Sequence, residues 1–491
     1  MKLVDLLDVK HQIYHLIQGT IEEVNIEYLS QDSRDIQDNT LFFCVPGTTF
    51  DGHQFAKMAE EKGAVCLVAS KHVDVKIPVV YVEDVIKTMA FLAMRFYHDP
   101  SGSMSLIGVT GTNGKTTTTH IIRHLFEKNK KSCGMIGTNG IWYHQEHIYT
   151  PNTTPDSLTL QKSLAKMKEE GVFICTSEVS SHALVMGRVQ NVDFNVAVFT
   201  NLTHEHLETH HTMAEYGMAK SLLFAQLGSG NNGKIAILNK DDTYAKVIAS
   251  RCNATIWYYS TKDPSAEFYA KDMVYLASKT EFTLVFQGLE YPVISPLIGE
   301  FNVQNALAAL AAYYALERHL EKGIEALSSF SGVEGRMQTI ENDLGIHAIV
   351  DFAHTPDGLE KAMAALKKLN HKRIITMIGH DGGNRDNSIR QDLGRIALEY
   401  SDYVVFTSEN PREEDPMKIM KEMVNGLEVH HYEFVKDRHK AIDRVVALGK
   451  KGDILFFTGK GHEPYQLIGC EKIPFHEAQF VKEALEKKTH E

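Results

Sequence analysis

The stretch Ile107-Gly-Val-Thr-Gly-Thr-Asn-Gly-Lys-Thr116 decides the fold. It joins a predicted apolar strand over 105–109 to a predicted helix, because the apolar residues that follow fall on one helical face: Ile121, Ile122, Leu125 and Phe126. A strand, a glycine turn and a helix form a phosphate-binding loop, in which backbone N–H groups and the helix N-terminus bind phosphate oxygens. The general motif has a glycine where Val109 stands, so this is the shorter Gly-Thr-Asn-Gly-Lys-Thr form.

The loop predicts a role for each of its residues. Gly111 and Gly114 allow the backbone to curl around phosphate. Lys115 is expected to reach the β- and γ-phosphates, and the Thr116 hydroxyl to bind Mg²⁺. A chance glycine-rich turn is the alternative, and the Lys-Thr pair at the strand-to-helix junction argues against it. The expected nucleotide contacts are Gly111, Thr112, Asn113, Gly114, Lys115, Thr116 and Thr117.

The composition is that of a globular protein of several domains. The 491 residues are 43% hydrophobic and 23% charged, and this length predicts roughly three domains. The chain has neither an apolar run near the ~18 residues of a membrane span nor a signal-peptide pattern, so a cytoplasmic protein without a membrane partner is expected. A net charge of −12 argues against a nucleic-acid partner. The six scattered cysteines favour reduced core residues over a disulfide or zinc framework.

The order of predicted elements indicates an α/β fold with three domains, at 1–98, 99–332 and 333–491. Pro and Gly interrupt the chain over 98–103, and a new block of strands begins near Gly332. We expect a central ATPase-type parallel sheet with the phosphate loop and a C-terminal Rossmann-like domain. Two such domains in series predict a ligand site in the cleft between them, closed by domain movement.

Three residues of the central block are candidates for magnesium chemistry. Glu178 ends a predicted buried strand and could bind Mg²⁺ beside Thr116. His206 lies in a histidine-rich segment and could bind a second ion, while zinc is disfavoured because the expected neighbours are hard oxygen donors. On one straight helix Lys220 would lie ~21 Å from His206. A capping box at Thr212-Met-Ala-Glu215 predicts a new helix, so the chain could fold back and bring Lys220 closer.

Polar residues also follow the later strands. Asn302 is expected to cap an alanine-rich helix, and Asn305 could read an adenine edge. Arg336, at the boundary of the third block, suits a γ-phosphate contact upon closure, and Asp351 ends a strand where a ligand would lie. Three further loops predict a site for the carboxylate and ammonium of an amino acid, although each alone could be an ordinary polar loop. They contain Arg385, Glu409, Asn410, Pro411, Arg412, Gly459 and Glu463.

Together these motifs resemble the Mur ligase family over essentially the whole chain. The resemblance implies ATP and Mg²⁺ as cofactors and a monomeric enzyme of peptidoglycan synthesis. It would add the third stem-peptide amino acid, expected to be meso-diaminopimelate, to UDP-MurNAc-L-Ala-D-Glu through an acyl phosphate. Addition of L-lysine or another amino acid, or another Mur-type or folylpolyglutamate-type amide ligation, is the alternative. A binding protein without catalysis is disfavoured because Lys115, Glu178, His206 and Lys220 are all present.

The resemblance also implies residue roles. Lys220 matches a carbamylated lysine that holds the second magnesium with His206 and Glu178. Glu409-Asn-Pro-Arg412 resembles the Asp-Asn-Pro-Arg signature of enzymes that add meso-diaminopimelate, with glutamate in place of the aspartate. Other matches to amino-acid contacts are Arg385, Gly459 and Glu463. Matches to residues around the UDP-sugar peptide are Ser33, Thr153, Thr154, Ser180 and Arg188.

Overall fold

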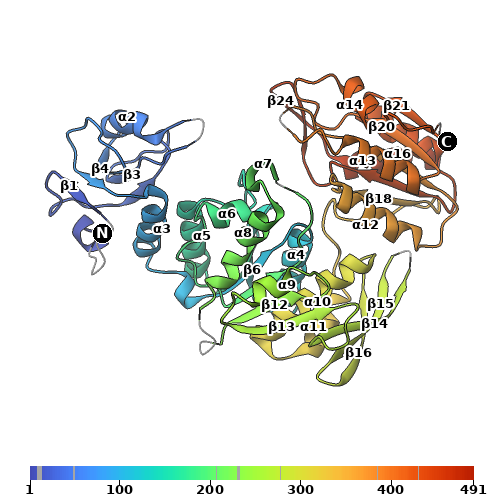
Figure 1. The fold of residues 1–491 in the computed structure, drawn as a ribbon, viewed down its shortest axis with the longest axis horizontal. Coiled ribbons are helices and arrows are strands. Elements are labelled where there is room, and N and C mark those ends of the chain that lie inside the picture. The colour runs from blue at the N-terminus through green and yellow to red at the C-terminus, as the bar shows by residue number, and fades with distance from the viewer. Residues whose placement is uncertain are drawn as a thin grey trace.

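The computed structural model describes residues 1–7, 14–47, 50–205, 207–228, 233–276, 278–383, 385–429 and 431–490. Within these ranges the chain forms three successive α/β lobes, each built on its own sheet (Figure 1). The predicted α/β fold class is confirmed. No helix in these ranges has the length and apolar surface that a bilayer crossing requires.

The N-terminal lobe is a five-stranded sheet in the order β1-β5-β4-β3-β2. The helical segment between β3 and β4 begins as a 3₁₀ turn, in which the Asp51 side chain accepts a hydrogen bond from the His53 N–H. Helix α3 packs against α5 of the next lobe. The strands are β1 (Leu16–Gln18), β2 (Tyr28–Ser30), β3 (Thr40–Phe43), β4 (Ala64–Ala69) and β5 (Val79–Tyr81), and the helices are α1 (Leu3–Leu7), η1 (Gly52–Phe55), α2 (Ala56–Glu61) and α3 (Val85–Phe96).

The central lobe is an eleven-stranded sheet in the order β16-β15-β14-β13-β12-β11-β6-β10-β7-β8-β9. Its seven central strands, β14, β13, β12, β11, β6, β10 and β7, are parallel to one another. Antiparallel strands extend both edges, β15 and β16 beside β14 and β8 and β9 beside β7. The strands are β6 (Ser105–Thr110), β7 (Cys133–Gly137), β8 (Gly140–Tyr143), β9 (Glu146–Ile148), β10 (Ile174–Glu178), β11 (Val196–Phe199), β12 (Ile235–Asn239), β13 (Thr255–Ser260), β14 (Phe268–Tyr275), β15 (Thr280–Phe286) and β16 (Leu289–Ser295).

Two hydrophobic cores enclose the central sheet. Helices α4, α10 and α11 contribute to one core, which includes the predicted apolar face of α4. Helices α5, α6, α8 and α9 contribute to the other. The helical elements of this lobe are η2 (Ser101–Ser103), α4 (Lys115–Lys128), α5 (Ser157–Glu169), α6 (Ser181–Val185), α7 (Leu207–His210), α8 (Met213–Ala225), α9 (Ala245–Ala249), α10 (Glu300–Glu317) and α11 (Leu320–Leu327).

The C-terminal lobe is a six-stranded sheet in the order β17-β18-β22-β19-β20-β21, parallel except for β17, with a separate hairpin of β23 and β24. The strands are β17 (Gln338–Ile340), β18 (His347–Asp351), β19 (Ile374–Ile378), β20 (Tyr403–Thr407), β21 (Tyr432–Val435), β22 (Ile454–Thr458), β23 (Tyr465–Ile468) and β24 (Glu471–Pro474). The helices are α12 (Pro356–Lys367), α13 (Arg390–Tyr400), α14 (Pro416–Met423), α15 (Arg438–Leu448) and α16 (Glu477–His490).

Candidate active site

The predicted phosphate loop connects β6 to α4 and is held against the end of β11. Gly111 and Gly114 have φ angles of 152° and 87°, in the region that favours glycine. A side chain on Gly114 would collide with the Asn305 amide oxygen. The N–H groups of Thr112 and Asn113 donate to the backbone and side-chain oxygens of Asn201, at 2.8 and 2.9 Å. The loop is therefore fixed by neighbouring strands and by α10.

Two lysines converge on this loop. Lys115 Nζ donates to the carbonyl oxygens of Gly111 and Thr112, at 2.9 and 2.8 Å. Lys220 is buried on α8, and its Nζ donates to the same Gly111 oxygen at 2.8 Å and lies 4.2 Å from the centre of the Tyr216 ring. Burial, reinforced by the nearby Lys115 charge, holds the pKa of Lys220 well below its usual value. This lowering favours the neutral amine of Lys220 over its ammonium form.

The start of the Lys220 helix agrees with the prediction of a new helix near Met213, and one of the two hydrogen bonds of the predicted capping box is formed. The Thr212 hydroxyl accepts from the Glu215 N–H at 3.1 Å, and α8 begins at Met213. His206, the predicted partner of Lys220, lies outside the described residues. The predicted approach of the two side chains therefore stays a prediction.

Glu178 lies at the end of β10 and is 1% exposed. Its carboxylate accepts from the Thr116 hydroxyl at 3.0 Å and from the Thr138 N–H and hydroxyl at 2.9 and 3.2 Å. The parallel strands β6 and β10 are adjacent, so their carboxyl ends bring Thr116 and Glu178 together. A hydroxyl beside a carboxylate is a set of hard oxygen donors that suits Mg²⁺.

Four residues predicted to surround the UDP-sugar peptide lie next to Glu178. The Thr153 hydroxyl is 3.2 Å from that of Thr138, and the Thr154 hydroxyl donates to the Glu178 backbone oxygen at 2.9 Å. The Ser180 N–H donates to the Thr154 hydroxyl, and Arg188 Nη1 donates to the Thr154 carbonyl. Ser33 is different, because it is a buried residue of the N-terminal lobe. Its carbonyl accepts from Lys62 Nζ at 2.8 Å.

A cavity of about 250 Å³ lies between the central and C-terminal lobes. Its lining includes Asn113 and Gly114 of the phosphate loop and the predicted nucleotide contacts Asn305, Arg336 and Asp351. Asn113 also bridges the lobes, since its amide nitrogen donates to Asp357 Oδ2 at 3.2 Å.

Arg336 and Asp351 meet at the wall of this cavity. The Arg336 guanidinium carbon lies 4.5 Å from the centre of the Phe352 ring, and its buried Nε has no hydrogen-bond partner in the structure. The Asp351 carboxylate accepts from the N–H groups of Met337 and Ala353, at 2.7 and 2.8 Å. Burial raises the pKa of Asp351, and the Arg336 charge opposes that rise.

The prediction that Asn302 caps the alanine-rich helix is wrong. Helix α10 starts at Glu300, with Gly299 at the cap position and a φ of 100° that favours glycine. Asn302 lies inside the first turn, where its amide donates to the Ile298 carbonyl at 2.8 Å and accepts from Asn305 Nδ2 at 3.0 Å. Its side chain therefore contacts Asn305 and does not cap the N-terminus of the helix.

A second cavity, of about 330 Å³, opens beside the first. Both cavities are lined by Phe352, His354 and Thr355, so they adjoin one another. The second cavity is also lined by three residues of the predicted amino-acid site: Arg385, Glu409 and Glu463.

The rest of the predicted amino-acid site lies behind these side chains. Asn410 Nδ2 donates to Glu463 at 3.1 Å, and the buried Lys460 Nζ donates to Asn410 Oδ1 at 2.9 Å. A side chain on Gly459 would lie 2.5 Å from Glu409 Oε2, and one on Gly382 would collide with the Pro411 carbonyl. Arg412 has a φ of 52° and lies near Asp381.

Sequence reasoning missed Thr138, Asp381 and Lys460 as members of these clusters. Each follows a buried strand within three residues, after β7, β19 and β22 respectively. The carboxyl end of a parallel strand was thus an available signal for all three.

Comparisons with known proteins agree with this geometry. Family models match residues 25–97 (Mur ligase family, catalytic domain), 109–313 (Mur ligase middle domain) and 335–461 (Mur ligase, glutamate ligase domain). A UDP-N-acetylmuramoyl-L-alanyl-D-glutamate–2,6-diaminopimelate ligase of Listeria monocytogenes is 41% identical over 99% of both chains, and that of Lactiplantibacillus plantarum is 42% identical over 94% of both. A solved structure with the same enzyme name superposes over 100% of both chains, with a TM-score of 0.73 and 30% identity.

Proposed function

Because the chain belongs to the Mur ligase family, we propose that it is an ATP-dependent ligase of peptidoglycan synthesis. It joins the amino group of meso-diaminopimelate to the D-glutamyl carboxylate of UDP-MurNAc-L-Ala-D-Glu. One observation carries this proposal: a cavity bordered by the phosphate loop adjoins a second cavity lined by Arg385, Glu409 and Glu463. The relatives that carry this activity in their names align with nearly the whole chain.

The reaction must overcome repulsion between two anions. A carboxylate oxygen of the dipeptide attacks the γ-phosphorus of ATP, the bond to the β-phosphate oxygen breaks, and ADP leaves. The amine then attacks the acyl carbon and loses a proton, and inorganic phosphate leaves as the amide forms. Lys115 and Arg336 supply positive charge beside the transferred phosphoryl group. Closure of the two lobes keeps water from the acyl phosphate.

Thr116 and Glu178 would hold one Mg²⁺, and carbamylated Lys220 would hold a second one with His206 and Glu178. The Thr116 hydroxyl and a Glu178 carboxylate oxygen are 3.0 Å apart, and such oxygen donors suit a hard cation. No group of three His, Cys, Asp or Glu side chains that could hold a metal occurs among the described residues, so phosphate oxygens and a carbamate would have to complete the ligand set. When bound, the ion screens the negative charge of the triphosphate.

Carbamylation of Lys220 is supported by its environment. Its pKa is strongly lowered by burial, and a neutral amine is the form that attacks carbon dioxide. Addition of carbon dioxide, with loss of one proton, converts the buried amine into an anionic carbamate that can bind a metal ion.

The remaining assignments are part of the same proposal. Gly111 to Thr117, Asn305, Arg336 and Asp351 bind the nucleotide. Ser33, Thr153, Thr154, Ser180 and Arg188 bind the UDP-sugar peptide, and the loops with Arg385, Glu409 to Arg412, Gly459 and Glu463 bind the amino acid. We place the domain boundaries after residues 98 and 332. Each of the three resulting segments has its own main sheet, which supports these boundaries. We expect a cytoplasmic monomer.

A phosphate-release assay tests the proposal. Release should require ATP, the UDP-muramoyl dipeptide and an amino acid together, and mass spectrometry should identify the UDP-tripeptide. Release that requires a folate instead of the UDP-dipeptide, or ATP binding without turnover, would contradict it.

A further inference from the structure

The cavity assigned to the amino acid is rich in carboxylates. Its described lining includes five acidic side chains, whereas Arg385 is the one arginine or lysine among those lining residues. The acidic residues are Glu205, Asp381, Asp386, Glu409 and Glu463. Such a lining attracts the ammonium groups of a diamino acid and repels an added carboxylate unless cations are free to meet it.

Asp381 engages both arginines of the predicted amino-acid site. A single carboxylate oxygen, Oδ2, lies 3.3 Å from Arg385 Nε and 3.6 Å from Arg412 Nη2. Asp381 follows β19, while Arg412 comes from the loop after β20, so two neighbouring strands of the sheet bring them together.

Unsatisfied polar atoms surround this contact. Asp381 Oδ1, Arg412 Nε and Glu409 Oε2 are all buried and have no hydrogen-bond partner in the structure. Glu409 is 4% exposed and lines the cavity. Buried polar groups are nearly always paired, so these atoms indicate a ligand that supplies both donors and acceptors here.

We propose that Asp381 is a specificity-determining residue, whose carboxylate occupies Arg385 and Arg412 and thereby weakens the preference for an incoming amino acid with a distal carboxylate. This inference rests on the proposed function. A distal carboxylate would have to displace Asp381, so binding exchanges one ion pair for another instead of adding a pair. L-lysine, which lacks that carboxylate, meets no such competition.

The neighbourhood makes the displacement costly. Once released from the arginines, the Asp381 carboxylate would remain beside Glu409, whose pKa is raised by burial and also by the Asp381 charge. The ligand carboxylate would add a further negative charge beside Asp381, near the same two arginines.

Replacing Asp381 with asparagine removes the charge of the side chain and keeps the backbone contacts of this loop. The Asp381 carbonyl accepts from Arg390 Nη2 at 3.0 Å, and the Gly382 N–H donates to the Asn410 carbonyl at 2.9 Å. Both contacts remain in Asp381→Asn, because no backbone atom changes. Asp381→Glu retains the charge and serves as the rescue variant.

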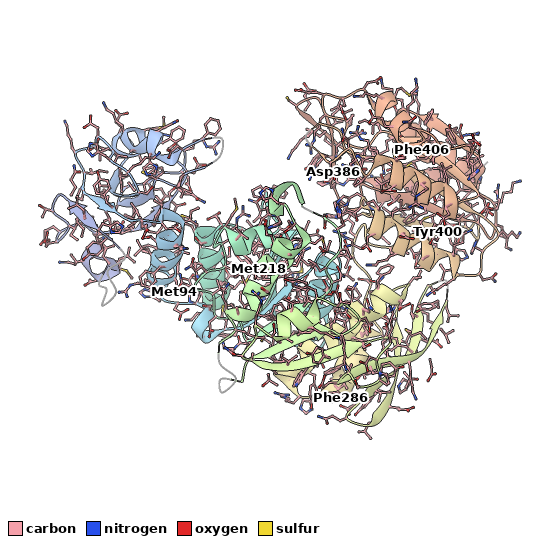
Figure 2. The ribbon with its side chains drawn as sticks, in the orientation of Figure 1. Met94, Met218, Phe286, Asp386, Tyr400 and Phe406 are labelled. Carbon is pink, nitrogen blue, oxygen red and sulfur yellow. The ribbon has the colours of Figure 1, made fainter. Side chains whose placement is uncertain are left out.

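Asp386→Asn is the matched control. Asp386 lines the same cavity, and Figure 2 shows it at the edge of the C-terminal lobe that faces the central lobe. Its Oδ1 accepts from the Ser388 N–H and hydroxyl, at 2.9 and 2.6 Å. The control therefore removes one negative charge from the same cavity, but from a carboxylate that is hydrogen-bonded to Ser388.

The experiment measures KM for meso-diaminopimelate and for L-lysine, with ATP and UDP-dipeptide saturating. Calorimetric Kd values for both amino acids are measured in the presence of ADP. In Asp381→Asn the diaminopimelate-to-lysine ratio of KM, and that of Kd, should fall about tenfold. Asp381→Glu should keep the wild-type ratios within about twofold, and Asp386→Asn, which frees neither arginine, should lower them much less than Asp381→Asn.

Unchanged ratios in Asp381→Asn, or an equal fall in Asp386→Asn, would overturn the inference. Failure of the proposed function looks different, because the wild-type protein would then release no phosphate with either amino acid. In that case the ratio of the calorimetric Kd values for diaminopimelate and L-lysine still tests the role of Asp381.

Discussion

Lys115 and Lys220 donate hydrogen bonds to one atom, the Gly111 carbonyl oxygen, at 2.9 and 2.8 Å. They come from different helices, α4 and α8, and meet only at the phosphate loop. Two ammonium groups that share one acceptor repel each other, which contributes to the low pKa of Lys220. A carbamate on Lys220 would convert this repulsion into attraction.

Lys220→Ala should reduce ligation at least ~100-fold, because a metal ligand is lost. Wild-type enzyme stripped of carbon dioxide should lose activity and regain it with bicarbonate, whereas the variant should not respond. Phosphate release is the measurement, and an unchanged thermal transition is the control for folding. Full turnover in the variant would show that no carbamate is needed.

Glu178→Gln should lower kcat by roughly 10²–10³, or ~3–4 kcal/mol of barrier. The amide keeps the size of the side chain and can still accept from the Thr138 N–H, so the fold should persist. Magnesium titrations of turnover should shift to higher concentration. Glu170→Gln, which removes a surface pair with Lys166 at 3.1 Å, is the control and should behave like the wild type. An equal magnesium requirement in both variants would exclude Glu178 as a ligand.

Glu409 should make the protein less stable as the pH rises. Burial and the Asp381 charge raise its pKa from 4.5 to about 8. Between those values the folded chain binds a proton that the unfolded chain has released, so the free energy of unfolding falls with increasing pH. Glu409→Gln removes this loss and should gain at least ~1 kcal/mol relative to the wild type between pH 5 and pH 9.

Thermal denaturation across that pH range measures the gain. The exposed Glu413→Gln is the control and should parallel the wild type. A constant difference between Glu409→Gln and the wild type at all pH values would show that Glu409 ionises normally in the folded protein.

Arg438→Met should destabilise the C-terminal lobe by ~3–5 kcal/mol, because it leaves the Glu477 carboxylate buried and unpaired. Both side chains are fully buried, and Arg438 also donates to the carbonyls of Ser408 and Thr458 at the ends of β20 and β22. Calorimetric unfolding is the measurement. Arg444→Ala breaks the more exposed pair with Glu433 and should cost at most ~1 kcal/mol. Equal losses would contradict a special role for the buried pair.

Local sequence patterns predicted much of the fold, because strands and their polar ends are encoded over a few residues. The strand before the phosphate loop, the α4 core face and the Thr212 cap all depend on near neighbours in sequence. The prediction for Asn302 was wrong for the same reason, because its residue type suits a cap but only the structure shows that Gly299 occupies the cap position.

The side-chain partners of the candidate site could not be predicted in the same way. Asp381 and Arg412 are separated by a helix and a strand, and their pairing depends on the adjacency of β19 and β20. The low pKa of Lys220 likewise depends on burial against a loop 109 residues earlier. Sequence alone placed the arginines at one end of the sheet, but not the carboxylate between them.

The sequence by itself determined the α/β class, the phosphate loop and the set of polar strand ends, because these depend on periodicity and on residue chemistry at short range. Tertiary structure alone decided which of those ends face each other and which charges are buried together. The physical reason is that strand order, helix packing and exclusion of water arise only when distant segments pack, and burial then sets the strength of every charge interaction in the cleft.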